Sequence, residues 1–318
     1  MDLCVMIEGQ EDVTWEQWRA LAAACEEHGV PALFRSDHYL SVEGLEGRGS
    51  LDAWGTLCGL AAVTSTLRLG TLVSPATFRH PAVLAKLAAT ADQISGGRIE
   101  VGLGAGWLEA EHAAFGFPFA DTRTRMEVFA EQVEIVRGLW GKGTFSYAGG
   151  HYRLDGVDAL PKPVQPRMPL IVGGRAGPKS VAIAARAADE YNTIYATPEE
   201  ARSRRAAAVD AWVAAGRDPA TLRFSIMTGC LVAGDEDALL ERAGRQAERR
   251  ATGRSADAEL AEATSGPWIT GTPEQALDRL RALSDAGVDR VMLQLHLHDE
   301  LDQIELIAQL KGSELRGV

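Results

Sequence analysis

Short apolar runs alternate with longer amphipathic runs along nearly the whole chain of 318 residues. The short runs have the length of buried strands, whereas the longer runs repeat apolar positions at helical spacing. They predict eight strands, at Leu3–Ile7, Ala32–Ser36, Arg68–Val73, Arg98–Leu103, Leu170–Val172, Glu190–Ile194, Arg223–Val232 and Arg290–Leu295. Two of the predicted helices are Trp15–Glu27 and Thr272–Asp285, the second opening with a Thr-Pro-Glu cap. Regular alternation of this kind predicts a parallel sheet with helices packed outside it.

Eight strand–helix units without a break in composition predict a (β/α)8 TIM barrel, an α/β fold, in a single domain spanning residues 1–318. A doubly wound open sheet is the alternative. Three segments do not fit the repeat: Tyr39–Ser50, Gly141–Pro169 and Arg250–Gly271. The second is rich in tyrosine, glycine and proline, which predicts a hairpin and an extended loop. Because barrel enzymes carry such insertions over the C-terminal mouth, we expect all three segments there.

The composition restricts the partners and the compartment. With a formal net charge of -12, the chain is a poor match for nucleic acid or for an anionic membrane surface, so we expect a small-molecule substrate. The N-terminus has no signal-peptide pattern, and no apolar stretch approaches the roughly 18 residues of a membrane span. The four cysteines form no CxxC pair, which favours a reducing compartment. These features predict a cytoplasmic protein.

Asp37 and His38 follow the second predicted strand, where a barrel has its mouth. Histidine can donate, accept or carry a proton near neutral pH, and an adjacent aspartate can fix its tautomer. A polar strand end with a capping aspartate is the alternative interpretation of the same pattern. Asp37 and His38 are the candidate catalytic residues.

Two glycine-rich runs follow later strands. Gly104, Ala105, Gly106 and Trp107 could bring the backbone close to a flat or phosphorylated ligand, although a purely structural turn is the alternative. A dinucleotide-binding fingerprint is a weaker interpretation, because the following run is broken by glycine and proline. The second run is Gly173, Gly174, Arg175, Ala176 and Gly177, directly before a predicted helix. Free amides at that helix start, together with basic side chains, predict an anion site, and a strand–helix turn with ordinary capping is the alternative.

Gln294, His296 and His298 alternate along the last predicted strand and share one of its faces. A His-x-His pair can bind a metal ion, but no further ligand at metal spacing stands out, so no metal site is predicted. A polar pocket wall or a capped strand end is the favoured interpretation.

Taken together, these motifs resemble the bacterial luciferase-like oxidoreductases, and most closely the branch that uses the deazaflavin coenzyme F420. The resemblance spans most of the chain, in the family's order, and rests on Ser36-Asp37-His38, Leu69–Pro75, Phe78–Pro81, Ser95–Arg98, Gly102–Trp107, Leu160–Gln165 and Ala188–Asn192. It implies a flavin-type ring in the barrel mouth and a protein that is often a homodimer.

The resemblance also implies a role for each candidate residue. His38 matches a histidine beside the reactive face of the ring, and Asp37 matches an acidic neighbour of the ring. A non-prolyl cis peptide at Leu72–Val73, followed by Ser74, matches a bulge behind the ring. The run Gly104, Ala105, Gly106 and Trp107 matches the loop along the ring, and Gly173 through Gly177 match the phosphate cradle. Trp107 stands where some sugar-phosphate dehydrogenases of the branch have a catalytic glutamate, which argues against a sugar-phosphate substrate.

The resulting hypothesis is an oxidoreductase that transfers a hydride between coenzyme F420 and an organic small molecule. In this hypothesis His38 exchanges the proton that accompanies hydride transfer. An FMN-dependent monooxygenase that uses reduced flavin and O2 is the first alternative. A barrel lyase or hydrolase without a cofactor, and a flavin-binding relative without turnover, are the others, because the fold does not decide between them.

Overall fold

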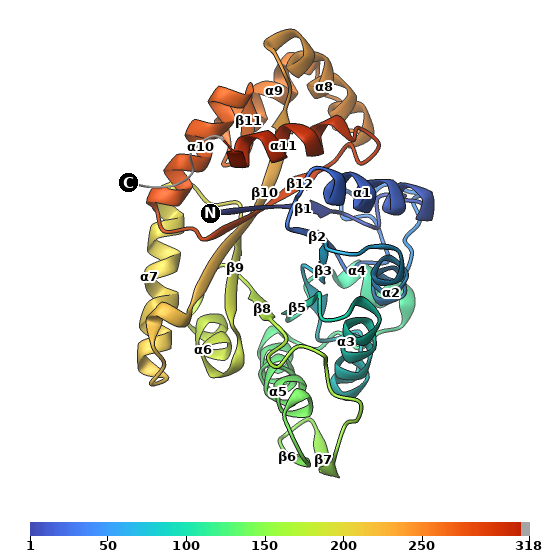
Figure 1. Cartoon of the computed structure of the whole chain (residues 1–318), viewed down its shortest axis with the longest axis vertical. Coiled ribbons are helices and arrows are strands. Elements are labelled where there is room, and N and C mark those ends of the chain that lie inside the picture. Colours follow the sequence, from blue (N-terminus) through green and yellow to red (C-terminus); the bar gives the residue numbers. More distant parts are fainter. Residues whose placement is uncertain (313–318) are drawn as a thin grey trace.

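Eight parallel strands close into a barrel, as the sequence predicted (Figure 1). They are β1 (Asp2–Ile7), β2 (Ala32–Arg35), β3 (Arg68–Thr71), β5 (Ile99–Gly104), β8 (Leu170–Gly173), β9 (Glu190–Ile194), β10 (Arg223–Val232) and β12 (Arg290–Leu295). Each pairs with the next in this order, and β12 pairs with β1 to close the ring. Two short strands extend the sheet: β4 (Ser74–Pro75) pairs with β5, and β11 (Ile269–Gly271) pairs with β10. This computed structural model describes residues 1–312, so residues 313–318 of the expected domain lie outside the described residues.

Helices surround the barrel, and most of them connect one barrel strand to the next (Figure 1). They are α1 (Trp15–Glu27), α2 (Ala53–Val63), α3 (Pro81–Ser95), α4 (Glu109–Phe115), α5 (Thr122–Trp140), α6 (Pro178–Ala187), α7 (Pro198–Ala214), α8 (Glu236–Arg249), α9 (Ala256–Ser265), α10 (Pro273–Asp285) and α11 (Asp302–Gly312). Helix α1 has the predicted bounds and α10 has Thr272 as its N-cap, also as predicted. None of the helices among the described residues is long and apolar enough to cross a membrane.

Side chains alternate between two cores along each strand, because successive residues of a strand point to opposite faces. In β1, Leu3, Val5 and Ile7 belong to the large core between strands and helices. Cys4 and Met6 instead belong to a smaller cluster inside the barrel, with Phe34 and Met292 among its other members. All four cysteines are free.

A buried ion cluster closes the N-terminal end of the barrel interior. The guanidinium of Arg290 lies 2.7 Å from the carboxylate of Glu100 and 2.5 Å from that of Glu190. All three side chains are almost fully buried. Burial would raise the pKa of Glu100, but the charges of Arg290 and Arg68 hold it at about 2. Removing Arg290 would deprive two buried carboxylates of the cation that they share, so this cluster is important for stability.

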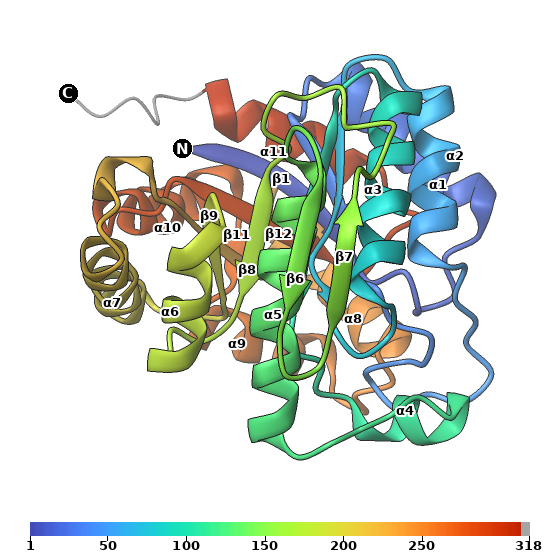
Figure 2. The same cartoon turned by 90° about the horizontal axis from the view of Figure 1, so that it is seen from below.

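The three insertions lie in different places. Residues of the 39–50 segment reach the mouth, and so does Arg250 at the start of the 250–271 segment, whose helix α9 packs against α8. The predicted hairpin is present as β6 (Phe145–Ala148) and β7 (Arg153–Val157). It lies along α5 (Figure 2). There the Glu131 carboxylate accepts hydrogen bonds from the amides of Gly150 and Tyr152. The hairpin supplies none of the residues that line the mouth cavity, so its expected position over the mouth is wrong.

Candidate active site

A cavity of about 540 Å³ opens at the C-terminal ends of the barrel strands. It brings together residues that the sequence analysis singled out in five separate places: His38, Leu72, Val73, Gly104, Ala105, Gly106, Trp107, Gly173, Gly174, Gln294 and His296. The lining residues at the ends of the neighbouring strands β3, β5 and β8 are mostly glycines and apolar side chains, and they form the glycine-rich half of the cavity. The lining residues at β1, β2 and β12 include carboxylates, imidazoles and an amide, and they form its polar half. A largely apolar cavity with a few convergent polar groups is the usual form of a small-molecule site.

The imidazole of His38 is held by a buried glutamate that the sequence analysis did not identify. His38 Nδ1 lies 3.0 Å from Oε1 of Glu111, whose side chain is fully buried. The other carboxylate oxygen of Glu111 accepts hydrogen bonds from the amides of Tyr39 and Leu40, at 2.5 and 3.3 Å. Because a carboxylate only accepts, Nδ1 carries the proton and Nε2 is the nitrogen left for the cavity. No sequence pattern distinguishes Glu111 from the neighbouring Glu109; only the fold of α4 does.

This contact sets the charge states of both groups. Burial would lower the pKa of His38, but the hydrogen bond that it donates to Glu111 and the negative charges of Glu111, Glu8 and Asp37 outweigh burial and raise it. Burial would likewise raise the pKa of Glu111, but the hydrogen bond and charge of His38 and the two amides lower it. Both shifts favour a protonated imidazole facing an ionised carboxylate.

Asp37 and Ser74 point away from the cavity. The Asp37 carboxylate accepts hydrogen bonds from Ser74 Oγ and from the guanidinium of Arg79, both at 2.6 Å, and Ser74 in turn accepts one from Trp54. Neither Asp37 nor Ser74 lines the cavity. Their positions give no support to a catalytic role for Asp37 or to a cofactor contact by the Ser74 side chain. Both instead brace the strand ends that carry His38.

The apolar half of the cavity is shaped by the turn after β3. The Leu72–Val73 peptide bond is cis, as the family resemblance implied. A side chain at Gly104 would lie 2.6 Å from Val73 Cγ2, so only glycine leaves the strand end flat at this point. Trp107 stands at the rim with 62% of its surface exposed, and its ring meets the His38 ring edge-on with centroids 5.7 Å apart.

The run from Gly173 to Gly177 connects β8 to α6. Tyr191 holds this loop, because its hydroxyl accepts a hydrogen bond from the Ala176 amide at 2.8 Å. Helix α6 begins after Gly177 with no side-chain cap, which leaves its first-turn amides open to an anion. Arg175 and Lys179 flank this point and form no ion pair with another described residue. Gly173 and Gly174 line the cavity itself, whereas Arg175, Ala176 and Gly177 lie beyond it.

Gln294 and His296 line the opposite wall, as the alternation along the last strand predicted. His298 is buried and contacts Arg249 instead. Burial and the charges of Arg250 and Arg249 lower the pKa of His296 to about 3, so its imidazole is neutral. Within residues 1–312, no group of three or more potential ligands is placed to hold a metal ion. Glu8, directly after β1, also lines this wall. The sequence analysis did not select Glu8, although its position at the end of a predicted strand indicated the barrel mouth.

Comparison with known proteins assigns the family. The sequence profile of the luciferase-like monooxygenases matches residues 4–290. The chain belongs to this family, as its motifs predicted. The fold agrees with that of an F420-dependent secondary alcohol dehydrogenase in complex with an F420-acetone adduct, with a TM-score of 0.81, 20% identity and 98% of each chain covered.

Characterised relatives divide between two cofactors. The chain is 30% identical to an F420-dependent hydroxymycolic acid dehydrogenase of Mycobacterium tuberculosis over 281 residues, which are 84% of this chain and 76% of that protein. It is also 30% identical to an FMNH2-dependent dimethylsulfone monooxygenase of Pseudomonas fluorescens, over 76% of this chain and 72% of that protein. An uncharacterised protein of M. tuberculosis is 37% identical over 171 residues, which are 53% of this chain and 58% of that relative's length.

Proposed function

We propose that this protein is an F420-dependent oxidoreductase that transfers a hydride to or from an organic small molecule in the mouth cavity. The proposal rests on the division of this cavity into a glycine-rich half and a polar half. Its glycine-rich half leads toward the uncapped start of α6, and His38, backed by Glu111, stands on its other side. A ring bound in the first half would present its reactive face to the second.

The residues present fit such a cofactor. Leu72 and Val73 would support the ring, and Gly104 and Gly173 keep its surroundings free of side chains, since a Cβ at either position would meet Val73. The amides at the start of α6 suit a phosphate group. When bound, the deazaflavin supplies the ring carbon that gives or accepts the hydride.

The protein itself supplies the proton and the orientation. With Nδ1 engaged by Glu111, His38 Nε2 can give a proton to a substrate oxygen or take one from it. The raised pKa of His38 favours the protonated imidazole, which suits proton donation during substrate reduction. Trp107 walls the cavity beside His38 and limits the positions that a substrate can take.

Two exposed cations support F420 over FMN. FMN ends at its phosphate, whereas F420 continues into an anionic tail of lactate and glutamate units. Arg175 and Lys179 stand beyond the phosphate position with no acidic partner among the described residues, where such a tail would run. An FMN-dependent monooxygenase is the second candidate, because the similarity to the dimethylsulfone monooxygenase is as high as that to the F420-dependent dehydrogenase.

Equilibrium titration of the cofactor-free protein with F420 and with FMN, followed by fluorescence, tests the proposal. We expect F420 to bind at least about 10-fold more tightly, which corresponds to about 1.4 kcal/mol. Replacing Arg175 and Lys179 together by alanine should weaken F420 binding more than FMN binding. Tighter binding of FMN would favour the monooxygenase, and binding of neither cofactor would exclude both candidates. A homodimer and a cytoplasmic location stay predictions.

A further inference from the structure

Glu8 is an ionisable group in the mouth cavity that forms no ion pair with another described residue. It follows the end of β1 and lines the cavity on the wall opposite the glycine-rich half. Its two carboxylate oxygens accept hydrogen bonds only from neutral amides, at 2.7 Å from Gln10 and 2.6 Å from Gln294. Each oxygen keeps a second acceptor position.

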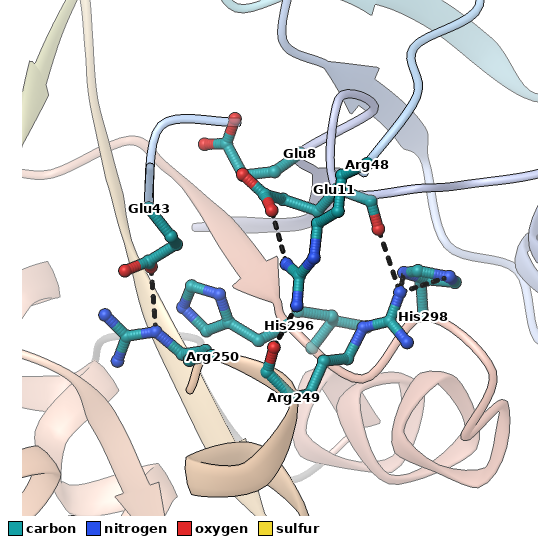
Figure 3. Close-up of a pocket in the computed structure, with 9 residues that line it drawn as sticks. Glu8, Glu11, Glu43, Arg48, Arg249, Arg250, His296 and His298 are labelled. Carbon is teal, nitrogen blue, oxygen red and sulfur yellow. Dashed lines mark hydrogen bonds and ion pairs between the residues drawn. The ribbon is translucent and has the colours of Figure 1, made fainter. Parts of the chain in front are cut away.

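The other carboxylates of this wall are neutralised by the protein. Glu11 pairs with Arg48, and Glu43 lies 2.9 Å from Arg250, as Figure 3 shows. Arg249 contacts the backbone oxygen of Glu11 and the ring of His298 and does not line the mouth cavity. The wall therefore keeps one negative charge that these arginines do not pair with, at Glu8.

Neighbouring side chains hold Glu8 in place. The hydroxyl of Tyr195 donates to the side-chain oxygen of Gln294, and this contact turns the amide nitrogen of Gln294 toward Glu8. Tyr195 has a φ of 42°, in the left-handed region that tyrosine seldom adopts. Strained backbone of this kind collects at functional sites, where the surrounding contacts maintain it. The carboxylate is thus a positioned group and not a freely moving side chain.

His296 offers a second polar contact on the same wall. Its ring stacks on Trp268 with centroids 5.3 Å apart, and it lines both the mouth cavity and the small adjoining cavity of Figure 3. Its Nε2 atom is shielded from solvent and has no hydrogen-bond partner among the described residues. Because this imidazole is neutral, it does not compensate the charge of Glu8.

We infer that Glu8 and His296 form a substrate-recognition subsite for organic amines, in which the carboxylate of Glu8 binds the ammonium group. This inference rests on the proposed function, since it takes the mouth cavity as the active site. A partly buried carboxylate with only neutral partners gains more from a cation than from a neutral donor, and it repels carboxylates and phosphates. The subsite thereby selects substrates by charge.

Three probes have a similar shape but different charges: benzylamine, benzyl alcohol and benzoate. Comparing them distinguishes the effect of ligand charge on binding from the effect of ligand shape. Their dissociation constants are measured by ligand-observed NMR at low ionic strength, with the protein first saturated with whichever flavin it binds. We expect benzylamine to bind about 10-fold more tightly than benzyl alcohol, and benzoate to bind most weakly. Glu8→Gln keeps the shape and one of the two accepting oxygens but removes the charge, and it should abolish the preference for the amine.

Glu27→Gln is the matched control, because Glu27 is exposed at the C-terminal end of α1, away from the barrel mouth, and its replacement changes net charge equally. Equal binding of amine and alcohol by the wild-type protein, or an amine preference that survives Glu8→Gln, would overturn the inference. The flavin titration is interpreted separately from the probe-binding measurements. Failure of flavin binding counts against the proposed function, whereas loss of the amine preference in a flavin-loaded protein counts against the subsite alone.

Discussion

His38 Nδ1 lies 3.0 Å from Glu111 Oε1, although 73 positions separate the two residues in the chain. The contact joins the end of β2 to the short helix α4, so the proton-carrying group at the mouth depends on a residue from a different strand–helix unit. Five predictions follow: three concern this pair, one the loop before α6 and one the ion cluster below the cavity.

His38→Ala should lower turnover by at least about 10²-fold if proton transfer limits the rate, because a general acid–base contributes roughly 10²–10⁴-fold. Affinity for the cofactor should fall much less, since the proposed site assigns most of that binding to ring contacts and to the amides of α6. Steady-state rates and a cofactor titration on the same variant measure both quantities. Near-normal turnover together with a large loss of affinity would show that His38 only orders the loop.

Glu111→Gln should lower the pKa of His38. The substitution removes the negative charge that raises this pKa and leaves burial, which acts in the opposite direction. A 1H–13C NMR titration of the His38 ring measures the change, with Glu109→Gln, on the exposed side of the same helix, as the control. An unchanged His38 titration in Glu111→Gln would mean that the contact does not set the charge of the imidazole.

The same pair makes stability depend on pH. The pKa of His38 is raised on folding, so its stabilisation is fully present below the ordinary value of 6.5 and is lost as the pH rises through the folded-state pKa. The difference in Tm between wild type and Glu111→Gln should therefore shrink as the pH rises above 6.5. Thermal unfolding at several pH values tests this, and a difference that grew with pH would contradict it.

Gly177→Val should weaken cofactor binding by at least about 10-fold and leave the protein folded. A Cβ at Gly177 would meet no atom within 4 Å, so the new side chain is tolerated by the protein but occupies the space of the bound anion. Gly234→Val is the matched control, because that glycine is equally open but lies in the turn between β10 and α8 and not at the start of α6. Cofactor titrations of both variants test this prediction. Equal cofactor affinities in the two variants would show that the loop before α6 does not bind the phosphate.

Arg290→Met should cost about 3–5 kcal/mol of unfolding free energy, because it leaves the buried carboxylates of Glu100 and Glu190 without their shared cation. Arg281→Met, which breaks an exposed pair with Asp278, should cost less than about 1 kcal/mol. Urea unfolding measures both. A loss below about 1 kcal/mol for Arg290→Met would show that the cluster relaxes or takes up water.

The order of the elements, the barrel and the glycine-rich half of the site could be predicted from the sequence. Their signals are local: apolar strand-length runs, helix caps and glycines at turns are contained in a few neighbouring residues. The strand that was expected to continue to Val73 ends instead at Thr71, before the cis bond. The hairpin at residues 145–157 was also predicted, but its position along α5 depends on contacts with Glu131 that no local pattern contains.

The sequence by itself determined the fold class, the family and the strand ends at which the chemistry gathers, because hydrophobic periodicity and turn residues act over short distances. Only the tertiary structure decided which polar side chains face the cavity. Asp37 turns toward Arg79 and out of the site, whereas Glu111 turns in to hold His38, and Glu8 is left with no cationic partner among the described residues. Charge pairing is settled by which groups the closed barrel brings within a few ångströms, and that distance is a property of the folded chain.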